Sequence, residues 1–216
     1  MELLSIVLAR ASLLCETGSL DPFGRMSSAE VFTQIKDRYS FVFVPQRSGE
    51  NADPDKGIEF GSGRLGEIVI DKLTVFTNGI VVDTRSSTDN SEAIASDLLA
   101  IATELLGSKV VVERRHFANQ ITFRSQMNLA KMNPVLSEIC EDIERSMAVD
   151  FKQSFVAEPV GVIITTDTTQ TRFAPTKFTI ERRADTPFFE NIYFSNSPFR
   201  TARHLEWVEK FERSIL

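Results

Sequence analysis

The chain has 216 residues, of which 42% are apolar and 25% are charged, a composition typical of a globular protein with a hydrophobic core. At this length, one α+β domain or two small units are expected. The net charge of −6 argues against general nucleic-acid binding, which uses a basic surface.

The first fifteen residues fit two kinds of structure. Their apolar residues recur at helical spacing, but Leu4, Ile6 and Leu8 also alternate as they would in a strand. The segment does not resemble a signal peptide, because Glu2 replaces the expected basic start and Arg10 interrupts the apolar run. No other stretch is long enough to span a bilayer, so we expect a cytoplasmic protein without membrane contact.

The next segments predict a helix and a strand. Ser27 and Glu30 have the spacing of a capping box, which predicts a helix over residues 28–38. Residues 41–44 alternate Phe and Val before a proline, which predicts a buried strand.

Residues 61–66, GSGRLG, match the G-x-G-x-x-G pattern of dinucleotide-binding loops. Such a loop needs a helix after it, whose N-terminal amides bind the pyrophosphate. The residues that follow, EIVIDKLTVF, are β-branched and predict a strand instead. We therefore expect Gly61, Gly63 and Gly66 to form a tight turn between strands, and we expect no nucleotide or other cofactor.

The dipeptide Asn78-Gly79 stands between two β-forming runs. It is a strong hairpin signal, because both central residues of a type I′ turn need a positive φ. The sequence therefore predicts antiparallel strands at about 67–77 and 80–84.

Three further helices are predicted. The first begins with the capping pair Asp89 and Glu92 and ends at Gly107. The second begins at Asn133-Pro134, with Asn133 as its N-cap, and the third covers residues 201–216. Val135, Ile139, Ile143 and Met147 line the apolar face of the second of these helices, and Leu136 and Cys140 widen it.

The residue patterns at about 110–126 and beyond residue 151 predict further strands. The predicted fold is α+β, with an antiparallel or mixed sheet, or two small sheets, and three to four amphipathic helices packed on one face. We expect an N-terminal unit at 1–107 and a C-terminal unit at 108–216, either separate or sharing one core.

The sequence offers few groups for catalysis. It has no G-x-S-x-G elbow, and its only histidines are His116 and His204. We expect His204 to be an exposed residue of the last helix. Cys15 and Cys140 have no zinc-binding spacing with these histidines and are expected to be buried free thiols.

Glu67 and Asp71 are the best candidates for metal-dependent chemistry. On one strand they share a face, and two carboxylates near Lys72 suggest a phosphoesterase or nuclease-like enzyme. No Glu-x-Lys spacing follows them, and a solvated strand face explains the same charges. A metal-dependent phosphoesterase or nuclease-like enzyme is therefore an alternative function, and the sequence predicts no specific metal ligands.

Arg114, Arg115 and His116, with Arg124 nearby, form the densest basic cluster. Phenylalanines lie close in sequence, and sheets that bind single strands stack bases on Phe beside arginines. Phe alternating with polar residues is also the pattern of a core face. A nucleic-acid or anion-binding accessory factor is therefore a second alternative.

The most unusual feature is the presence of 17 Phe against 2 Tyr and 1 Trp. Residues 187–199, PFFENIYFSNSPF, carry large apolar groups that must be covered either by the core or by a partner. Our leading hypothesis is a non-enzymatic interaction or assembly subunit that forms a homo-oligomer or hetero-complex through this segment. The predicted partner-binding residues are Phe188, Phe189, Tyr193, Phe194, Phe199 and Trp207.

Overall fold

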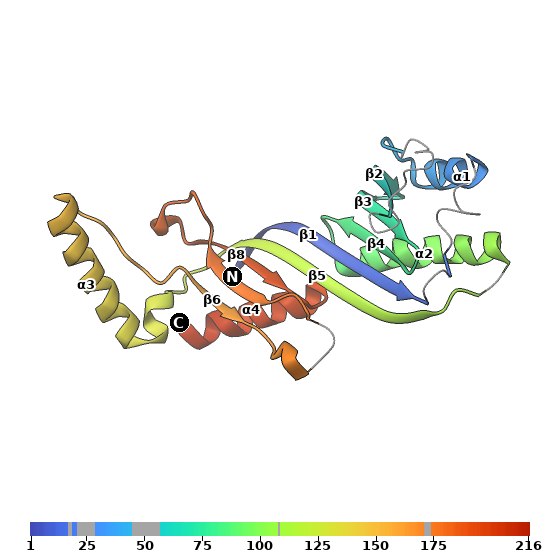
Figure 1. Ribbon diagram of the computed structural model, residues 1–216. Helices are drawn as coiled ribbons and strands as arrows, with labels where there is room; N and C mark the ends of the chain where they lie inside the picture. The colour runs from blue at the N-terminus through green and yellow to red at the C-terminus, as the bar shows by residue number, and fades with distance from the viewer. Residues whose placement is uncertain (17–18, 21–28, 45–56, 108, 171–173) are drawn as a thin grey trace. The chain divides into compact units, whose positions relative to one another are not determined.

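A computed structural model describes residues 1–16, 19–20, 29–44, 57–107, 109–170 and 174–216 (Figure 1). In this described part, an eight-stranded sheet in the order β2-β3-β4-β1-β5-β8-β7-β6 accompanies four α-helices. The predicted α+β class is therefore confirmed. The strands are β1 (Glu2–Cys15), β2 (Ile58–Leu65), β3 (Ile68–Phe76), β4 (Gly79–Thr84), β5 (Val112–Arg124), β6 (Gly161–Ile164), β7 (Phe178–Arg182) and β8 (Ile192–Ser197). The helices are α1 (Ala29–Tyr39), α2 (Thr88–Leu106), α3 (Pro134–Phe151) and α4 (Thr201–Ile215), with short 3-10 turns at η2 (Leu129–Met132), η3 (Thr168–Gln170) and η4 (Phe188–Glu190).

The chain divides into two compact units. The N-terminal unit comprises Ile6–Gln120 and Pro198–Thr201. The C-terminal unit comprises Met1–Ser5, Ile121–Ser197 and Ala202–Leu216. Strands β1 and β5 each contribute residues to both units, because the boundary falls within them.

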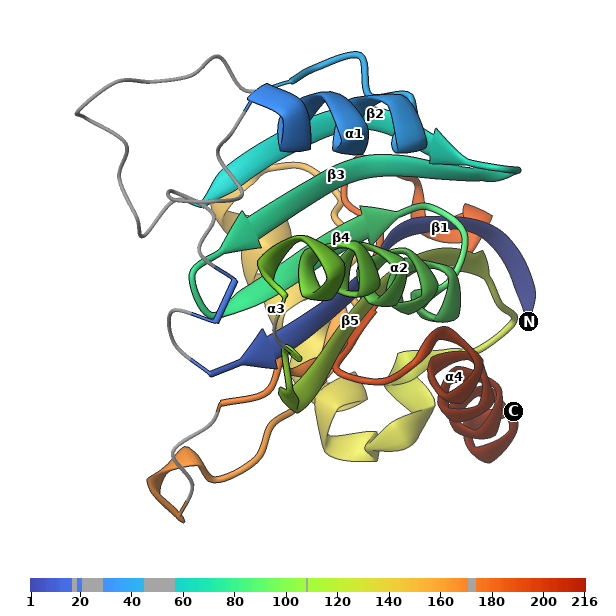
Figure 2. The same ribbon diagram turned by 90° about the vertical axis from the view of Figure 1, so that its right-hand side faces the viewer.

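In the N-terminal unit, α1 and α2 cover one face of the strands (Figure 2). Ile35 of α1 and Leu98 of α2 join Ile70, Ile80 and Val82 of the strands in one buried cluster. Beside this cluster, the partly exposed Asp97 of α2 accepts a hydrogen bond from the hydroxyl of the buried Tyr39 at 2.7 Å and forms an ion pair with Arg38. The two helices are thus joined by apolar burial and by one polar cluster.

The first fifteen residues form a strand, which settles the choice that the sequence left open. Ala9, Ala11, Leu13 and Cys15 are buried, whereas the residues between them are more exposed. A period of two is the signature of a strand with one covered face.

The predicted hairpin exists, but its turn differs from the prediction. Phe76 pairs with Gly79, so the two turn residues are Thr77 and Asn78. Neither Asn78 nor Gly79 has a positive φ, and the type I′ assignment is therefore wrong. Gly79 is needed for another reason, because a Cβ there would lie 2.6 Å from the carbonyl oxygen of Leu13 on β1.

The glycine motif also has a different structure from the one predicted. Gly61 and Gly63 lie within β2, and only Gly66 stands in the turn, with a φ of 57°. A Cβ on Gly63 would lie 2.4 Å from the Phe41 ring. The turn prediction is correct for Gly66 and wrong for the other two, and at Gly63 the absence of a side chain makes room for Phe41.

The predicted strand at residues 41–44 is wrong. Phe41 is buried, but Val42 and Phe43 are exposed, and the segment makes a single bridge, between Phe43 and Gly61. The alternation of Phe and Val over four residues predicted a strand. In the structure Phe41 packs in the core, but the segment does not form a continuous β-ladder with β2.

Most predicted helix ends are confirmed. Gly107 is the left-handed C-cap of α2, and the Asn133 side chain caps α3 by accepting from the Val135 amide at 3.0 Å. The cap of α2 is Ser87 rather than Asp89, since its hydroxyl accepts from the Asn90 amide at 3.1 Å. The predicted cap at Ser27 lies outside the described residues.

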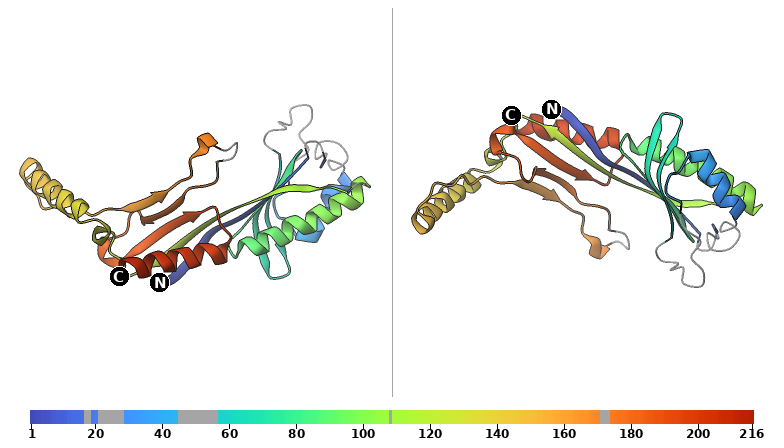
Figure 3. Two further views of the ribbon diagram at one scale, coloured as in Figure 1. Left: turned by 90° about the horizontal axis from the view of Figure 1, so that it is seen from below. Right: turned by 90° about the horizontal axis from the view of Figure 1, so that it is seen from above.

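In the C-terminal unit, β6, β7 and β8 form an antiparallel ladder and α4 lies against it. Ile180, Tyr193 and Val208 are fully buried there. Helix α3 extends away from these strands (Figure 3) and has no buried residue. The apolar face predicted for α3 is not buried by the described chain, since Val135, Ile139 and Ile143 are exposed and Met147 is only partly buried. Over the same described ranges, no helix is both long and apolar enough to cross a bilayer.

Candidate interaction site

Tyr193 belongs to the core of the C-terminal unit. Its ring stacks on Phe123 with a centroid distance of 5.7 Å, and its hydroxyl donates to the carbonyl oxygen of Met127 at 2.9 Å. Burial raises the pKa of this phenol. A side chain with its ring covered and its hydroxyl occupied holds the fold together.

The other aromatic residues predicted to bind a partner lie in different surroundings. Phe194 is half-buried, and β-strand alternation places it on the face of β8 opposite to Tyr193. Phe199 belongs to the N-terminal unit and is exposed. Trp207 is an exposed residue of α4, with the Lys210 ammonium 4.6 Å from its ring centroid.

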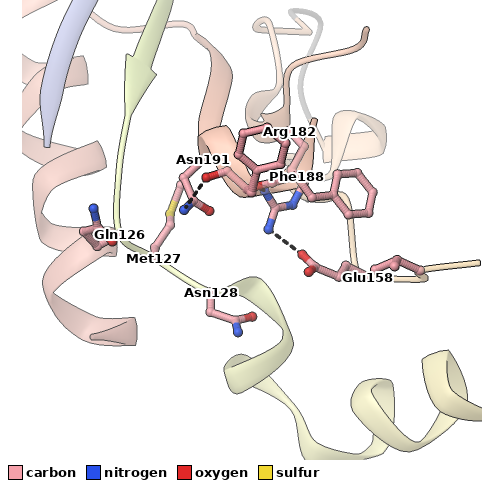
Figure 4. A pocket seen from close by; sticks show the side chains of 9 residues that line it. Gln126, Met127, Asn128, Glu158, Arg182, Phe188 and Asn191 are labelled. Carbon is pink, nitrogen blue, oxygen red and sulfur yellow. Dashed lines mark hydrogen bonds and ion pairs between the residues drawn. The ribbon is translucent and has the colours of Figure 1, made fainter. Parts of the chain in front are cut away.

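Phe188 and Phe189 line a cavity of about 760 Å³ in the C-terminal unit (Figure 4). Phe189 is 82% exposed at this site. Three carboxamides also line the cavity: Gln126, Asn128 and Asn191. Of the aromatic residues named by the sequence, these two phenylalanines are therefore the pair that the structure brings to one concave surface.

Arg182 is held rigidly in the wall of this cavity. One terminal nitrogen, Nη1, donates to the Phe188 carbonyl oxygen at 2.9 Å, and Nη2 forms an ion pair with Glu158. The guanidinium carbon lies 4.8 Å from the Phe188 ring centroid and 5.3 Å from that of Tyr193. The Nε hydrogen is buried without a partner among the described residues, which costs about 1–3 kcal/mol and is offset by the ion pair and the ring contacts.

The described lining of the cavity offers hydrogen-bonding groups that can bind a ligand. Among the described residues that line it there is no histidine, cysteine or serine, and the one carboxylate, Glu158, is paired with Arg182. The remaining polar groups are neutral amides that both donate and accept hydrogen bonds. An uncharged ligand rich in amides, such as a peptide backbone, matches these groups.

Ser195 and His204 resemble a catalytic pair but cannot act as one. Their Oγ and Nε2 atoms are 2.8 Å apart, and both residues are fully buried. The Ser195 hydroxyl donates to the Thr179 carbonyl oxygen at 2.6 Å, so it accepts from His204, whereas a nucleophile would donate to the histidine. Burial lowers the pKa of His204 to about 4, and the expected exposed position of His204 is wrong.

The basic cluster is divided by the alternation of β5. Arg115 pairs with Glu92 of α2 at 3.0 Å, so Arg114 and His116 point to the opposite face of the strand. Burial and the nearby Arg114 lower the pKa of His116. Arg124 lies in the C-terminal unit and pairs with Glu2 at 3.0 Å. The four residues therefore do not form one basic surface.

The carboxylates proposed for a metal are also separated. Strand β3 begins at Ile68, which leaves Glu67 in the turn, and the register shifts between Ile70 and Lys72. Asp71 accepts from Arg85 at 2.8 Å. No group of three histidines, cysteines or carboxylates that could hold a metal occurs within the described ranges.

The cysteines lie in different environments. Cys15 is buried and lines a smaller cavity of about 380 Å³ in the N-terminal unit. Burial and the charge of Glu113 raise the pKa of its thiol, which keeps it protonated and unreactive. Cys140 is partly exposed on α3, so the expected burial is confirmed only for Cys15.

No family model matches the chain, and no curated protein matches it.

Helix α3 carries a surface that the sequence pattern did not distinguish from core. We define the α3 surface as the exposed apolar residues Val135, Leu136, Ile139 and Ile143. An amphipathic helix has the same pattern whether its own core or another molecule covers it, so only the tertiary structure separates the two cases.

The cavity and α3 are connected along the chain. Gln126, Met127 and Asn128 precede η2, and Val156 and Glu158 follow α3, and both segments line the cavity. The Ala157 amide also donates to Glu144 of α3 at 2.8 Å. The cavity thus lies where the chain leaves the strands for α3 and where it returns.

Proposed function

We propose that this protein is a non-enzymatic interaction subunit whose partner packs on the α3 surface. The observation that carries the proposal is an 18-residue helix with no buried residue and a row of exposed aliphatic side chains. Helices of this kind in folded proteins bury their apolar stripe against another element, and exposed apolar patches mark interaction sites.

The charges on α3 favour a basic partner. Arg145 is the only basic residue in the helix, and it is paired with Asp142. Two copies of α3 packed together would bring like charges close, which is destabilising. A partner with aliphatic residues flanked by lysine or arginine complements both features. The acidic residues are Glu138, Glu141, Asp142, Glu144 and Asp150.

The cavity beside the ends of α3 adds a second contact to the proposal. Its three carboxamides suit the backbone of a bound segment, and the exposed Phe189 ring offers apolar area at the rim. The aromatic segment therefore contributes through Phe188 and Phe189, whereas Tyr193 contacts Arg182 of the cavity wall from the core.

The two alternative functions have less support. A metal-dependent phosphoesterase needs Glu67 and Asp71 on one face, but Glu67 lies in a turn and Asp71 is paired with Arg85. A nucleic-acid-binding factor needs a continuous basic face, but Arg115 and Arg124 are each paired with a carboxylate.

The proposal is tested with a fluorescent amphipathic peptide of leucine and lysine whose binding is followed by anisotropy. The informative variant is the double substitution Ile139→Asp and Ile143→Asp. It removes apolar area from the α3 surface and adds negative charge. Apolar docking predicts at least tenfold weaker binding, whereas simple charge attraction predicts tighter binding.

The matched control is Val69→Asp, which places the same new charge at a 61% exposed position of the N-terminal unit. It should leave peptide affinity within about twofold of the parent protein. Equal or tighter binding of the peptide to the α3 double variant would refute the proposed docking surface.

A further inference from the structure

Strand β6 ends the sheet in the C-terminal unit, since it pairs with β7 on one side and is the last strand in the order. In the described part of the chain, no strand pairs with its other side. An open edge presents unpaired amide and carbonyl groups, which makes it a template for another strand.

The register shows which backbone groups are open. The Arg182 amide donates to the Val160 carbonyl oxygen at 2.6 Å, and Gly161 pairs with Glu181. Because hydrogen bonding alternates along an antiparallel ladder, Val162 and Ile164 direct their backbone groups to β7. Gly161 and Ile163 direct theirs outward, to the open edge.

The side chains of this edge are also uncovered. Ile163 is 62% exposed on one face of the strand, and Ile164 is 54% exposed on the other. No charged residue occurs between Glu158 and Asp167. Natural sheets block open edges with lysine, proline or bulges, and β6 itself has none of these between Val160 and Thr166.

The other edge strand of the sheet, β2 in the N-terminal unit, differs from β6 in its charges, its backbone geometry and its pairing. Strand β2 carries the charged residues Glu59 and Arg64, and Ser62 has a positive φ. Phe43 also bridges to Gly61 on its outer side. Among the described residues, the β2 edge is therefore blocked and the β6 edge is open.

We infer that β6 pairs with β6 of a second copy of this chain, in an antiparallel arrangement about a two-fold axis at Ile163. In this register Gly161 lies opposite Thr165 and Val162 opposite Ile164, so every outward amide meets a carbonyl. The pairing brings no like charges together, because this stretch has none. That distinguishes β6 from the acidic α3, where a second copy would be repelled.

The expected dimer is weak. Residues 161–165 of each copy give an interface well below the roughly 1,200–2,000 Å² of stable complexes. Dimerisation should therefore appear between micromolar and millimolar protein concentration. It uses a different surface from α3 and does not depend on the proposed function.

The test combines sedimentation equilibrium over that concentration range with two substitutions at one residue. Ile163→Pro removes an outward amide without removing a bond to β7, and Ile163→Lys places two positive charges opposite each other in the dimer. Each should weaken dimerisation at least tenfold. Val69→Lys, at a similarly exposed position of β3, and the α3 double variant should leave it unchanged.

Amide hydrogen exchange gives an independent readout that does not rely on variants. The Ile163 amide should become protected as protein concentration rises, because only the dimer bonds it. The Val162 and Ile164 amides, which face β7, should be protected equally at all concentrations. A monomer throughout the range would overturn the inference. So would a dimer that survives both Ile163 substitutions, a dimer lost in the α3 variant, or an Ile163 amide with unchanged exchange.

Discussion

His204 should make the stability of this protein depend on pH in a way that one substitution reveals. Burial lowers the pKa of its imidazole from 6.5 to about 4 in the folded protein. Between these values the unfolded chain binds a proton that the folded protein excludes. The stabilisation is therefore complete above the unfolded pKa and is lost as the pH falls towards the folded pKa.

The size of the effect follows from the two pKa values. A difference of roughly 2.5 between them corresponds to about 3 kcal/mol once the unfolded state is fully protonated and the folded state is not. Between about pH 7.5 and about pH 5 the free energy of unfolding should fall by ~2 kcal/mol through His204 alone.

The assay is urea unfolding at both pH values for the parent protein and for His204→Gln. The glutamine amide can donate to Ser195 Oγ as the imidazole does, but it does not titrate. Carboxylates such as Glu212 titrate in both proteins, so their contribution cancels in the comparison. The parent should lose ~2 kcal/mol more than the variant between the two conditions.

Ser195→Ala provides the control, because it removes the hydrogen-bond acceptor at 2.8 Å and keeps the buried imidazole. It should be less stable at both pH values and keep the pH dependence of the parent. If the parent and His204→Gln lose equal stability on acidification, burial of a neutral imidazole is not the cause and the reasoning fails.

Two predictions concern the N-terminal unit, and both are checked by urea unfolding at neutral pH. Gly63→Ala should lower the free energy of unfolding by about 2 kcal/mol, because the new methyl would meet the Phe41 ring at 2.4 Å. Gly66→Ala meets no neighbouring atom but keeps a positive φ, so it should cost about 1 kcal/mol, and equal losses at the two sites would contradict this distinction. Tyr39→Phe should cost about 1.5 kcal/mol, because the buried hydroxyl donates to Asp97 at 2.7 Å. A Tyr39→Phe protein as stable as the parent would show that this bond contributes nothing.

Features set by neighbouring residues could be predicted from the sequence. Asn133-Pro134 starts α3 and Gly107 ends α2 because caps and left-handed glycines act through the backbone within one turn. The β-forming residues after GSGRLG predicted a strand for the same local reason, and β3 begins there at Ile68.

The roles of the remaining glycines could not be predicted locally. Gly63 and Gly79 were interpreted as turn residues, but each makes room for a group distant in sequence, Phe41 in one case and Leu13 in the other. Only the pairing of strands brings those groups near. The pairing of the basic cluster could not be predicted either, because Arg115 contacts Glu92 only after α2 has packed on the sheet.

The candidate site could not be predicted from local sequence either. The sequence predicted that the aromatic segment is covered either by the core or by a partner, but β-strand alternation and packing distributed its residues between core, cavity and surface. Arg182 and Glu158, which form the cavity wall, gave no sequence signal because their pairing spans strands and loops.

The sequence by itself determined the α+β class, most helix boundaries and the hairpin, because these depend on periodicity and on backbone preferences within a few residues. Only the tertiary structure decided that His204 is buried, and that the described part of the chain leaves α3 uncovered and the edge of β6 open. An apolar stripe or a β-forming run predicts that an element will be covered, but whether the same chain supplies the cover depends on contacts between distant residues.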